Sequence, residues 1–570
     1  MDTNRLDLCY KARASSVTNA SNLDRPNRDI LVMTLRLKDV ELPVNAAGDD
    51  QLLHAVATKL SVDPSTVKSL IIRKKSLDAR RKARIVYHYQ VDVDVYNEPS
   101  VLAHAGGVAE AVGPEAVADP LDGLPAGPYR FRHMPIIIGS GPAGTFAAIA
   151  LARAGQPCLI VERGEPVEQR LRTVGKLRRD GSFDSESNYC FGEGGAGTFS
   201  DGKLTCGRNH PLVKFLFQQW VDYGAPAEIL YEAHPHIGTD YLLRIAKNQR
   251  TALEAAGCEF LFKRRFVDVQ SGGTEARYRV TLDDGVTYKT DHLILAIGHS
   301  ARDTYEMLLD RGLAIAPKPF AVGARFEHPQ EVINKIQFGS CEILPAAEYK
   351  LAAHAQDRGI WTFCMCPGGH LLPTNAQPGH LAINGMSYHA RNSGFANAAV
   401  VVNVLREDYY RGHPLDGVKF QAAIEKAAFA AGGGNYHSPA QRMVDFMAGR
   451  LSRGDMKSTY EPGVTSARLD KILPEFIASA LKEAVVDYNK KMRGYIAPDA
   501  LVVGVETKTS SPIVMTRDRN LQSVSHPGLF PCGEGAGFAG GIVSASLDGV
   551  RVGRAVLDDA IDSALAQRLN

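Results

Sequence analysis

The sequence predicts an α/β protein built from a doubly wound parallel sheet, an inserted α+β domain and a small N-terminal α+β module. Three observations indicate this fold class. Residues 134–164 follow the order strand, glycine turn, helix and strand of a βαβ unit. Residues 533–541 form a second glycine-rich segment far along the chain, and residues 84–95 alternate apolar and polar side chains as a half-buried strand does. A chain of 570 residues is long enough for two or three such domains.

The overall composition excludes several classes of protein. The formal net charge is only +2, so the chain as a whole is not built for a polyanionic partner. The 9 cysteines are scattered without a dense framework, which favours a reducing compartment. The N-terminus lacks the apolar core of a signal peptide, and the most apolar window, residues 134–151, is divided by its glycine turn. We expect a soluble cytoplasmic protein without a membrane partner.

Residues 31–96 predict the small module, after a flexible polar tail at residues 1–30. Asp49 and Asp50 can cap the helix that follows them. The expected elements are a strand, a helix and a second strand, at residues 31–44, 51–60 and 84–95.

A strongly basic stretch, residues 73–84, connects the helix to the second strand and contains one acid, Asp78. Such a density of cations can bind the phosphates of a nucleic acid. We favour a solvated loop or a docking face for an acidic partner, because no aromatic residue for base stacking is interleaved. The cations are Arg73, Lys74, Lys75, Arg80, Arg81, Lys82 and Arg84.

The βαβ unit carries the features of a dinucleotide site. Gly139 permits the tight turn, Gly141 lets backbone N–H groups reach a pyrophosphate, and Gly144 lets the helix pack on the strand. Glu162 ends the second strand at a distance that suits hydrogen bonds from ribose hydroxyls. Strand, turn, helix, strand and acid all occur in order, which makes chance agreement improbable. The predicted binding residues here are Gly139, Gly141, Pro142, Ala143, Gly144, Glu162 and Arg163.

Two later segments complete this pattern. A hairpin turning at residues 284–285 leads into the buried strand 293–298, and the strand "GLFPC" breaks at Gly533 and Glu534 into a glycine-rich helix start. Together with "GSGPAG" and "VERG", these segments resemble the glutathione-reductase-type FAD fold. The resemblance implies that Glu534 hydrogen-bonds the ribityl chain and that the following helix points its positive end at the flavin. The residues implied are Ala296, Gly298, Gly533, Glu534, Gly540, Gly541 and Ile542.

Further segments narrow the resemblance. "SLDARRK", "FGEGGAGTFSDGKL", "HPHIGTDYL", "FCMCPGGH" and "NGMSYHARNSGFANAAVVV", in this order, resemble a bacterial and plastid family of FAD-dependent, NAD(FAD)-utilising dehydrogenases whose physiological substrate is unassigned. The resemblance covers nearly the whole chain from about residue 30. It implies a bound FAD and a two-domain flavoprotein core, but no named reaction.

The segment 191–204, "FGEGGAGTFSDGKL", combines five glycines with a lysine. Its small residues allow close approach of the backbone to a ligand, and Lys203 can place a cation near phosphate or flavin. In related flavoproteins a comparable segment wraps the isoalloxazine ring. We therefore expect Gly195, Thr198 and Lys203 to bind the cofactor, with a mobile surface loop as the alternative.

Cys364 and Cys366 are the candidates for a catalytic role, although no catalytic residue can be assigned. In an extended segment their thiols would point the same way. Buried structural thiols are the favoured interpretation, thiol redox chemistry beside the flavin is the second, and a metal site with His370 and His380 fits no common spacing. No acid–base role can be assigned to the histidines near the motifs, which are His234, His236, His299, His389 and His437.

The segments predict a discontinuous domain organisation. Residues 97–130, rich in Ala, Gly and Pro, predict a linker. The FAD-binding domain is expected at residues 131–205, 231–309 and 496–570, and the substrate domain at residues 206–230 and 310–495. Within the substrate domain, helices are expected at residues 392–410, 415–430 and 466–492.

The sequence thus predicts an FAD-dependent oxidoreductase that transfers a hydride through flavin N5 to or from an unidentified small substrate. NADH or NADPH is a candidate transient donor, because no second GxGxxG follows a strand to form a dedicated NAD(P) domain. Two alternatives remain open: an RNA-modifying flavoprotein that uses residues 73–84, and a sensory or docking protein with a non-catalytic FAD.

Overall fold

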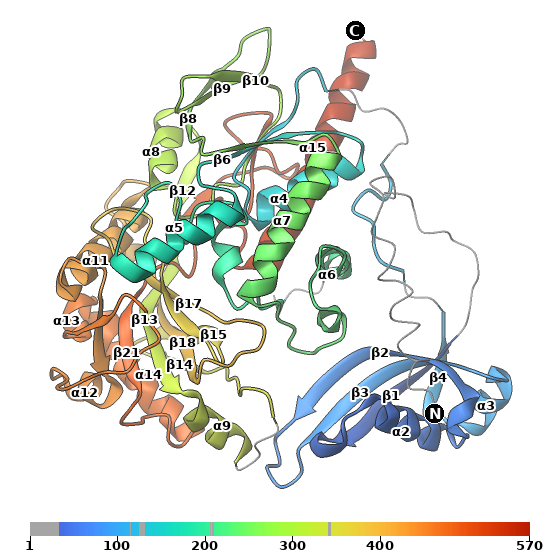
Figure 1. Cartoon of the computed structure of the whole chain (residues 1–570). Coiled ribbons are helices and arrows are strands. Elements are labelled where there is room, and N and C mark those ends of the chain that lie inside the picture. The colour runs from blue at the N-terminus through green and yellow to red at the C-terminus, as the bar shows by residue number, and fades with distance from the viewer. Residues whose placement is uncertain are drawn as a thin grey trace.

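The computed structural model describes residues 34–113, 116–124, 131–205, 207, 210–339 and 344–569, with side-chain surroundings as far as residue 561. The tail expected at residues 1–30 lies outside these ranges. The N-terminal module lies beside a larger body, in which a parallel sheet and its helices adjoin a second sheet (Figure 1). Within the described ranges, no helix is both long and apolar enough to cross a membrane.

The N-terminal module is a four-stranded sheet with the strand order β2-β3-β1-β4. Two helices share one core with the apolar residues of the strands, among them Leu35, Val56 and Val91. Gly48, and not Asp49 or Asp50, caps the first helix; both acids lie in its first turn, where they favour the helix dipole. The elements are β1 (Thr34–Pro43), α2 (Asp49–Leu60), β2 (Val67–Asp78), β3 (Val86–Val95), α3 (Glu98–His104) and β4 (Ala109–Val112).

Two parts of the module differ from the expectation. The basic stretch begins inside strand β2, which the sequence did not reveal because two register shifts against β3 leave it without an alternating pattern. Arg73 on this strand pairs with the buried carboxylate of Asp92 at 2.6 Å, so part of the positive charge is neutralised within the module. Residues 97–112 are not a linker, because they form α3 and β4, and β4 pairs with β1.

The parallel sheet has five strands in the order β23-β11-β5-β6-β7. This order confirms the predicted βαβ unit, and it brings the C-terminal strand to the same sheet. A small antiparallel sheet, β10-β9-β8, contains the predicted hairpin. The strands are β5 (Ile136–Ile138), β6 (Leu159–Glu162), β7 (Glu259–Phe262), β8 (Phe266–Ser271), β9 (Tyr278–Leu282), β10 (Thr287–Thr290), β11 (Leu293–Leu295) and β23 (Leu529–Pro531).

Helices α4 and α15 pack against each other and against this sheet. Helix α6 belongs to the same core through Phe215, Leu216 and Trp220, so residues 210–230 are part of this domain and not, as the sequence predicts, of the substrate domain. The apolar residues of α6 recur at helical spacing, but such spacing does not indicate against which sheet a helix packs. The helices are α4 (Pro142–Arg153), α5 (Val167–Asp180), α6 (Leu212–Asp222), α7 (Thr239–Ala255), α8 (Arg302–Asp310) and α15 (Ile542–Leu569).

The inserted domain is built on a seven-stranded sheet with the order β14-β15-β18-β13-β21-β19-β20. Helix α11 contributes to its core, as the sequence predicted for residues 415–430; the helix expected at residues 466–492 is divided into α13 and α14, because Pro474 starts a new helix. Its elements are β13 (Phe320–Pro329), α9 (Gln330–Phe338), β14 (Ala352–Ala355), β15 (Arg358–Cys366), β18 (Phe395–Val404), α10 (Arg406–Tyr409), α11 (Asp416–Gly432), β19 (Ser438–Arg442), α12 (Met443–Ala448), β20 (Val464–Ser466), α13 (Leu469–Ile472), α14 (Glu475–Lys491) and β21 (Leu501–Glu506). Two short sheets accompany it: β16 (His370–Pro373) with β17 (Ile383–Met386), and β12 (Ile315–Pro317) with β22 (Ile513–Met515).

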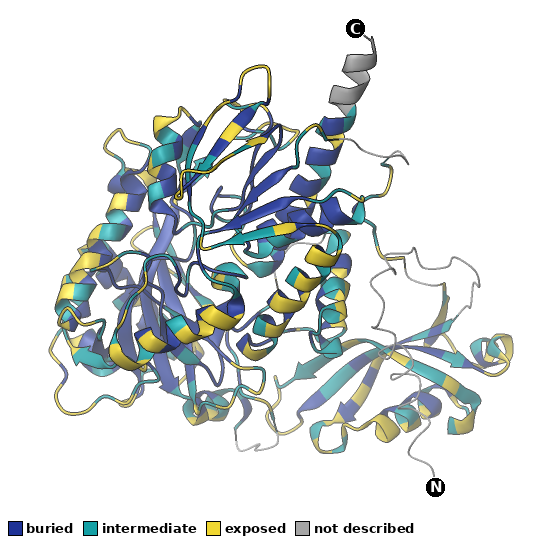
Figure 2. Ribbon diagram, turned by 45° about the horizontal axis from the view of Figure 1, so that its top comes forward, coloured by how far each residue is buried: buried dark blue, intermediate teal, exposed yellow. Residues whose placement is uncertain are grey.

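The predicted helix at residues 392–410 is wrong, because most of it is β18, an interior strand of this sheet. Nearly every residue of β18, which lies between β13 and β15, is buried, so its apolar run has no period that distinguishes a strand from a helix. Strand β21 also pairs in this sheet, so the inserted domain extends past residue 495. Figure 2 shows the buried residues concentrated in the strands of the main body.

Candidate functional site

A cavity lies between the parallel-sheet domain and the inserted domain. The walls from the first domain include the two glycine segments and the carboxyl ends of β5 and β6, where ligands of open α/β sheets bind. The walls from the inserted domain are supplied by Phe363, Cys364, Cys366, Asn384, Gly385, Lys508 and Thr509. Most of the predicted binding residues line this cavity, namely Gly139, Gly141, Pro142, Ala143, Glu162, Arg163, Gly195, Lys203, Ala296, Gly298, Glu534, Gly540, Gly541 and Ile542.

The first glycine turn has the close contacts that the sequence predicted. Gly139 has φ +102°, and a Cβ there would lie 2.4 Å from the carbonyl oxygen of Ala296. A Cβ on Gly144 would lie 1.9 Å from the carbonyl oxygen of Gly139, so only glycine lets α4 pack this closely. Gly144 therefore shapes the turn and does not line the cavity.

The two glycine segments, remote in sequence, meet in space. A Cβ on Gly533 would lie 2.6 Å from the Cβ of Ala143, in the first turn of α4. The Gly533 N–H donates to Asp548 on α15, so Gly533 also supports the wall from behind. Gly540 and Gly541 precede α15 and would place a Cβ in open space. The N-termini of α4 and α15 thus both face one cavity.

Glu162 is buried at the end of β6, and protein groups saturate its carboxylate. Oε2 accepts hydrogen bonds from the N–H and hydroxyl of Ser140, at 3.0 and 2.8 Å. Oε1 accepts from the N–H groups of Gly164 and Gly192, both at 3.0 Å. Glu162 therefore holds three loops around the cavity, and a ribose hydroxyl would have to displace one of these donors.

Arg163 lies beside Glu162 and stacks over the ring of Phe191, with 4.1 Å from the guanidinium carbon to the ring centroid. Its guanidinium pairs with Glu186 and Asp303, each at 3.0 Å. Arg264 and Arg265 line the same end of the cavity. Arg264 pairs with Asp284 and Arg265 with Asp303, so the end near β6 is a network of ion pairs.

Glu534 lies in the cavity wall with one oxygen 3.2 Å from Nδ1 of His299. His299 Nε2 is buried and has no hydrogen-bond partner among the described residues. The sequence singles out His299 but indicates no partner for it; Glu534 is that partner. The structure pairs them because β11 and β23, which precede these two residues, are adjacent parallel strands.

Lys203 lines the cavity but its charge is already compensated. Its ammonium lies 3.0 Å from Asp201 and 3.2 Å from Glu348. Burial opposes the charge of Lys203, but the nearby negative groups, chiefly Asp201 and Glu348, together outweigh it, so the pKa of Lys203 is raised. Thr198 does not line the cavity; its hydroxyl donates to the carbonyl of Glu193 at 3.2 Å and secures the turn before Lys203.

Cys364 and Cys366 both line the cavity, but a bulge after Phe363 breaks the expected alternation. Cys364 has φ +41° and is exposed, whereas Cys366 is fully buried. Both thiols are free, and burial raises the pKa of Cys366 to about 11, so it is protonated at neutral pH. In the described part of the chain, no group of three or more His, Cys, Asp or Glu side chains is arranged to hold a metal ion.

The inserted domain contributes a buried ionic wall that sequence reasoning missed. Arg325 and Glu506 are both fully buried and paired at 2.8 Å. Arg325 also donates to the carbonyl of Cys364 at 2.9 Å and to Asn384, which lines the cavity. No spacing signal could reveal this group, because its members lie on separate strands and pair only in the folded sheet.

A third cysteine, Cys190, also lines the cavity, and its sequence neighbours gave no sign of this. The ammonium of Lys508 lies 3.6 Å from its sulfur, and the thiol donates to the carbonyl of Thr374 at 3.3 Å. Lys508 is buried and also donates to Ser300 at 3.2 Å. Cys190 is thus held between the two domains.

The other histidines lie near the cavity wall or away from it. His236 and His389 stack with ring centroids 5.0 Å apart, and burial lowers the pKa of His236 to about 4. His234 pairs with Glu348. His437 lies against Gly463, away from the cavity.

Three family descriptions match parts of this chain. Residues 135–173 match an FAD binding domain, residues 319–509 match "FAD-dependent protein, C-terminal domain-like", and residues 34–94 match a domain of unknown function, DUF8436. An uncharacterized protein of Clostridium beijerinckii is 39% identical over 535 residues, which are 92% of this chain and 99% of that protein.

Solved structures with a similar arrangement are more distant. The halogenase PltM is 11% identical, with 76% of this chain and 70% of that chain covered and a TM-score of 0.36. The flavin-dependent brominase Bmp2 is 13% identical, with 75% and 79% covered and a TM-score of 0.36. A flavoprotein/dehydrogenase from Cytophaga hutchinsonii is 14% identical, with 76% and 79% covered and a TM-score of 0.32. Such low TM-scores support no inference about the reaction.

Proposed function

The chain belongs to the same family as the Clostridium beijerinckii protein and is an FAD-dependent flavoprotein, and from this premise we propose that it is an oxidoreductase whose FAD binds in the interdomain cavity. One observation carries the proposal. The glycine turn before α4 and the glycines before α15, far apart in sequence, line the same cavity. This arrangement fits one elongated coenzyme held at both ends, as in the glutathione-reductase-type fold.

The first glycine turn would hold the pyrophosphate. The N-terminus of α4 presents unpaired N–H groups, and a Cβ on Gly141 would have only the Cα and N of Gly195 within 4 Å. Arg163 and Phe191 lie at the end near β6, where the adenosine would bind. Because Glu162 already accepts four hydrogen bonds from the protein, its main role is to hold the binding loops in place.

The other end would take the flavin. A bound flavin supplies two-electron chemistry through its N5 atom. Glu534 would accept hydrogen bonds from the ribityl hydroxyls, with His299 Nδ1 orienting its carboxylate. The N-terminus of α15 would favour negative charge at this end. Cys364, Asn384 and Lys203 would face the substrate, which is a small molecule of unidentified class.

NADH or NADPH is the proposed electron donor, bound transiently at the inserted domain.

The RNA-modifying alternative is weaker than the sequence suggested. Three of its cations pair with carboxylates inside the module, since Arg73 binds Asp92, Arg80 binds Asp78 and Arg84 binds Glu41, so less charge remains for phosphates.

Absorbance spectroscopy tests the proposal directly. The purified protein, supplied with FAD and freed of excess, should keep a flavin spectrum, and anaerobic NADH or NADPH should bleach it. A protein that cannot retain FAD contradicts the proposal. A protein that keeps FAD but is bleached by no donor favours the sensory alternative instead.

A further inference from the structure

One extended segment, residues 231–238, lies between the N-terminal module and the cavity wall. At its first end it pairs with strand β2 of the module. The N–H of Lys75 donates to the carbonyl of Tyr231 at 2.8 Å, and the N–H of Ala233 donates to the carbonyl of Lys75 at 2.9 Å. The ammonium of Lys75 lies 3.0 Å from Glu232. Burial opposes this charge, but Glu232 outweighs it and raises the pKa of Lys75.

At its second end the same segment pairs with residues 201–204, of which 201–203 line the cavity. The N–H of Leu204 donates to the carbonyl of Pro235 at 3.0 Å, and the N–H of Ile237 donates to the carbonyl of Gly202 at 3.1 Å. Lys203 therefore stands between two main-chain hydrogen bonds supplied by this segment. Such bonds fix a backbone position more firmly than exposed side-chain contacts do.

A series of side-chain contacts also connects this segment to Lys203, beside the main-chain hydrogen bonds. His234, which directly follows the residues paired with β2, hydrogen-bonds Glu348. Glu348 in turn lies 3.2 Å from the ammonium of Lys203. Burial opposes ionisation of Glu348, but His234 and Lys203 lower its pKa to about 2, so it is charged at neutral pH. The position of the Lys203 ammonium thus depends on residues next to the module's docking site.

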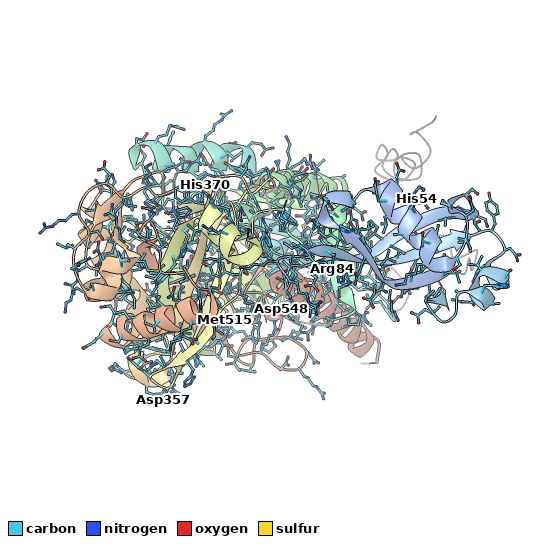
Figure 3. All side chains as sticks on the ribbon, turned by 90° about the horizontal axis from the view of Figure 1, so that it is seen from below. His54, Arg84, Asp357, His370, Met515 and Asp548 are labelled. Atoms are coloured by element: carbon cyan, nitrogen blue, oxygen red, sulfur yellow. The ribbon has the colours of Figure 1, made fainter. Side chains whose placement is uncertain are left out.

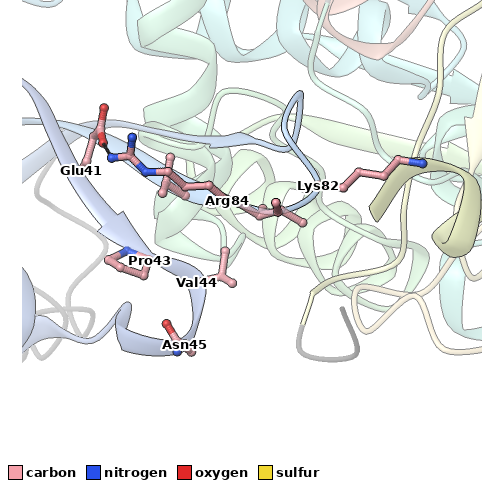
Figure 4. A pocket seen from close by; sticks show the side chains of 9 residues that line it. Glu41, Pro43, Val44, Asn45, Lys82 and Arg84 are labelled. Carbon is pink, nitrogen blue, oxygen red and sulfur yellow. Dashed lines mark hydrogen bonds and ion pairs between the residues drawn. The ribbon is translucent and has the colours of Figure 1, made fainter. Parts of the chain in front are cut away.

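The module is anchored by the hairpin between β2 and β3. Ile85, just before β3, is 7% exposed and belongs to the core of the inserted domain, not to the core of the module. Leu77 and Ala79 pack against the same core. Figure 4 shows Lys82 extending from this hairpin towards α9, while Arg84 turns back to Glu41. In Figure 3, Arg84 lies nearer to the main body than His54 does.

We propose that the N-terminal module is a positioning element of the cavity: by pairing β2 with residues 231–233, it fixes the segment that holds Lys203 in the cavity wall. The proposal rests on the proposed function for the role of the cavity, but not on any particular reaction. Lys75 and Glu348 act in it as positioning residues, since neither touches the reacting atoms.

The test uses Ile85→Asp in the full-length chain. A charged side chain at this site should undock the hairpin from the inserted domain, while the module's own core stays intact. Hydrogen–deuterium exchange is then followed in peptides covering residues 200–206 and 231–238. We expect amide exchange in both segments to rise at least tenfold, and FAD release to accelerate severalfold. Matched controls are Ile71→Asp, at a side chain that is 48% exposed on β2, and the conservative Ile85→Val; neither should change the exchange.

The outcomes separate cleanly. Faster exchange at residues 231–238 with unchanged exchange at 200–206 overturns the proposal, and so does no change at either segment. Exchange is measured with and without FAD. A protein that binds no flavin contradicts the proposed function, whereas the exchange pattern still tests the role proposed for the N-terminal module. As a second variant, Glu348→Gln should speed exchange at residues 200–206 but leave the amide of Ala233 protected. It removes the ion pair with Lys203 and leaves the pairing of β2 with residues 231–233 intact.

Discussion

The two walls of the cavity differ mainly in their glycines, because the wall from the parallel-sheet domain combines two glycine segments with charged side chains such as Glu162, Arg163 and Glu534. On the parallel-sheet side, main-chain groups of glycine segments and the starts of α4 and α15 face the cavity. On the inserted-domain side, the wall is held by charged side chains that are buried, such as Arg325 with Glu506. Main-chain groups suit a coenzyme that many proteins of one fold have in common. Side chains can differ between such proteins and so suit different substrates. If the proposed function is correct, the first wall binds the coenzyme and the second contacts the substrate.

The largest expected effect comes from breaking the side-chain wall. Arg325→Met removes the ion-pair partner of the fully buried Glu506, whose pKa burial already raises, so this carboxyl must take up a proton or stay charged without its partner. We expect the free energy of unfolding to fall by about 3–5 kcal/mol, measured by urea denaturation. The control Arg80→Met removes an exposed partner of Asp78 and should leave the midpoint unchanged. Equal midpoints in both variants would show that the buried pair does not support this wall.

The main-chain wall predicts a loss of binding without a loss of stability. A Cβ added at Gly141 would have its nearest non-neighbouring heavy atom 3.7 Å away, so Gly141→Val should fold but occupy the space of the pyrophosphate. We expect about a 100-fold weaker FAD affinity, measured by fluorescence titration, with an unfolding midpoint close to that of the parent. Gly175→Ala, on α5 and outside the residues that line the cavity, serves as the control. Retention of FAD by Gly141→Val would place the coenzyme elsewhere.

This contrast also explains how much could be predicted from the sequence. The glycine turn, Glu162 and the segment around Glu534 were predictable because main-chain contacts with a ligand demand glycines at fixed spacings. Cys190, Lys508 and the Arg325–Glu506 pair were not, because any buried position of a strand can carry such residues and only tertiary pairing brings them together. Strand β18 was mistaken for a helix for a similar reason, since burial on both faces removes the period.

A smaller effect is expected on the pH dependence of the unfolding free energy, through a buried histidine of the inserted domain. His328 on β13 is fully buried, and burial lowers its pKa to about 4 from about 6.5 in an unfolded chain. The unfolded state therefore binds a proton first as the pH falls. Stability is fully present above about pH 6.5 and is lost towards pH 4, at up to about 1.4 kcal/mol per pH unit from this residue. His328→Gln should flatten the dependence of the unfolding free energy on pH, whereas the exposed His54→Gln should not.

The smallest effect is expected at the two cysteines that first suggested redox chemistry. Cys366 is buried and protonated at neutral pH, and its thiol donates to the carbonyl of Cys364 at 3.3 Å, so it offers no thiolate to a flavin. Cys364→Ser, at the exposed position, should therefore change the flavin spectrum and the rate of flavin reduction by less than twofold. A long-wavelength charge-transfer band that disappears in Cys364→Ser would restore the thiol hypothesis and would mean that the side-chain wall takes part in electron transfer.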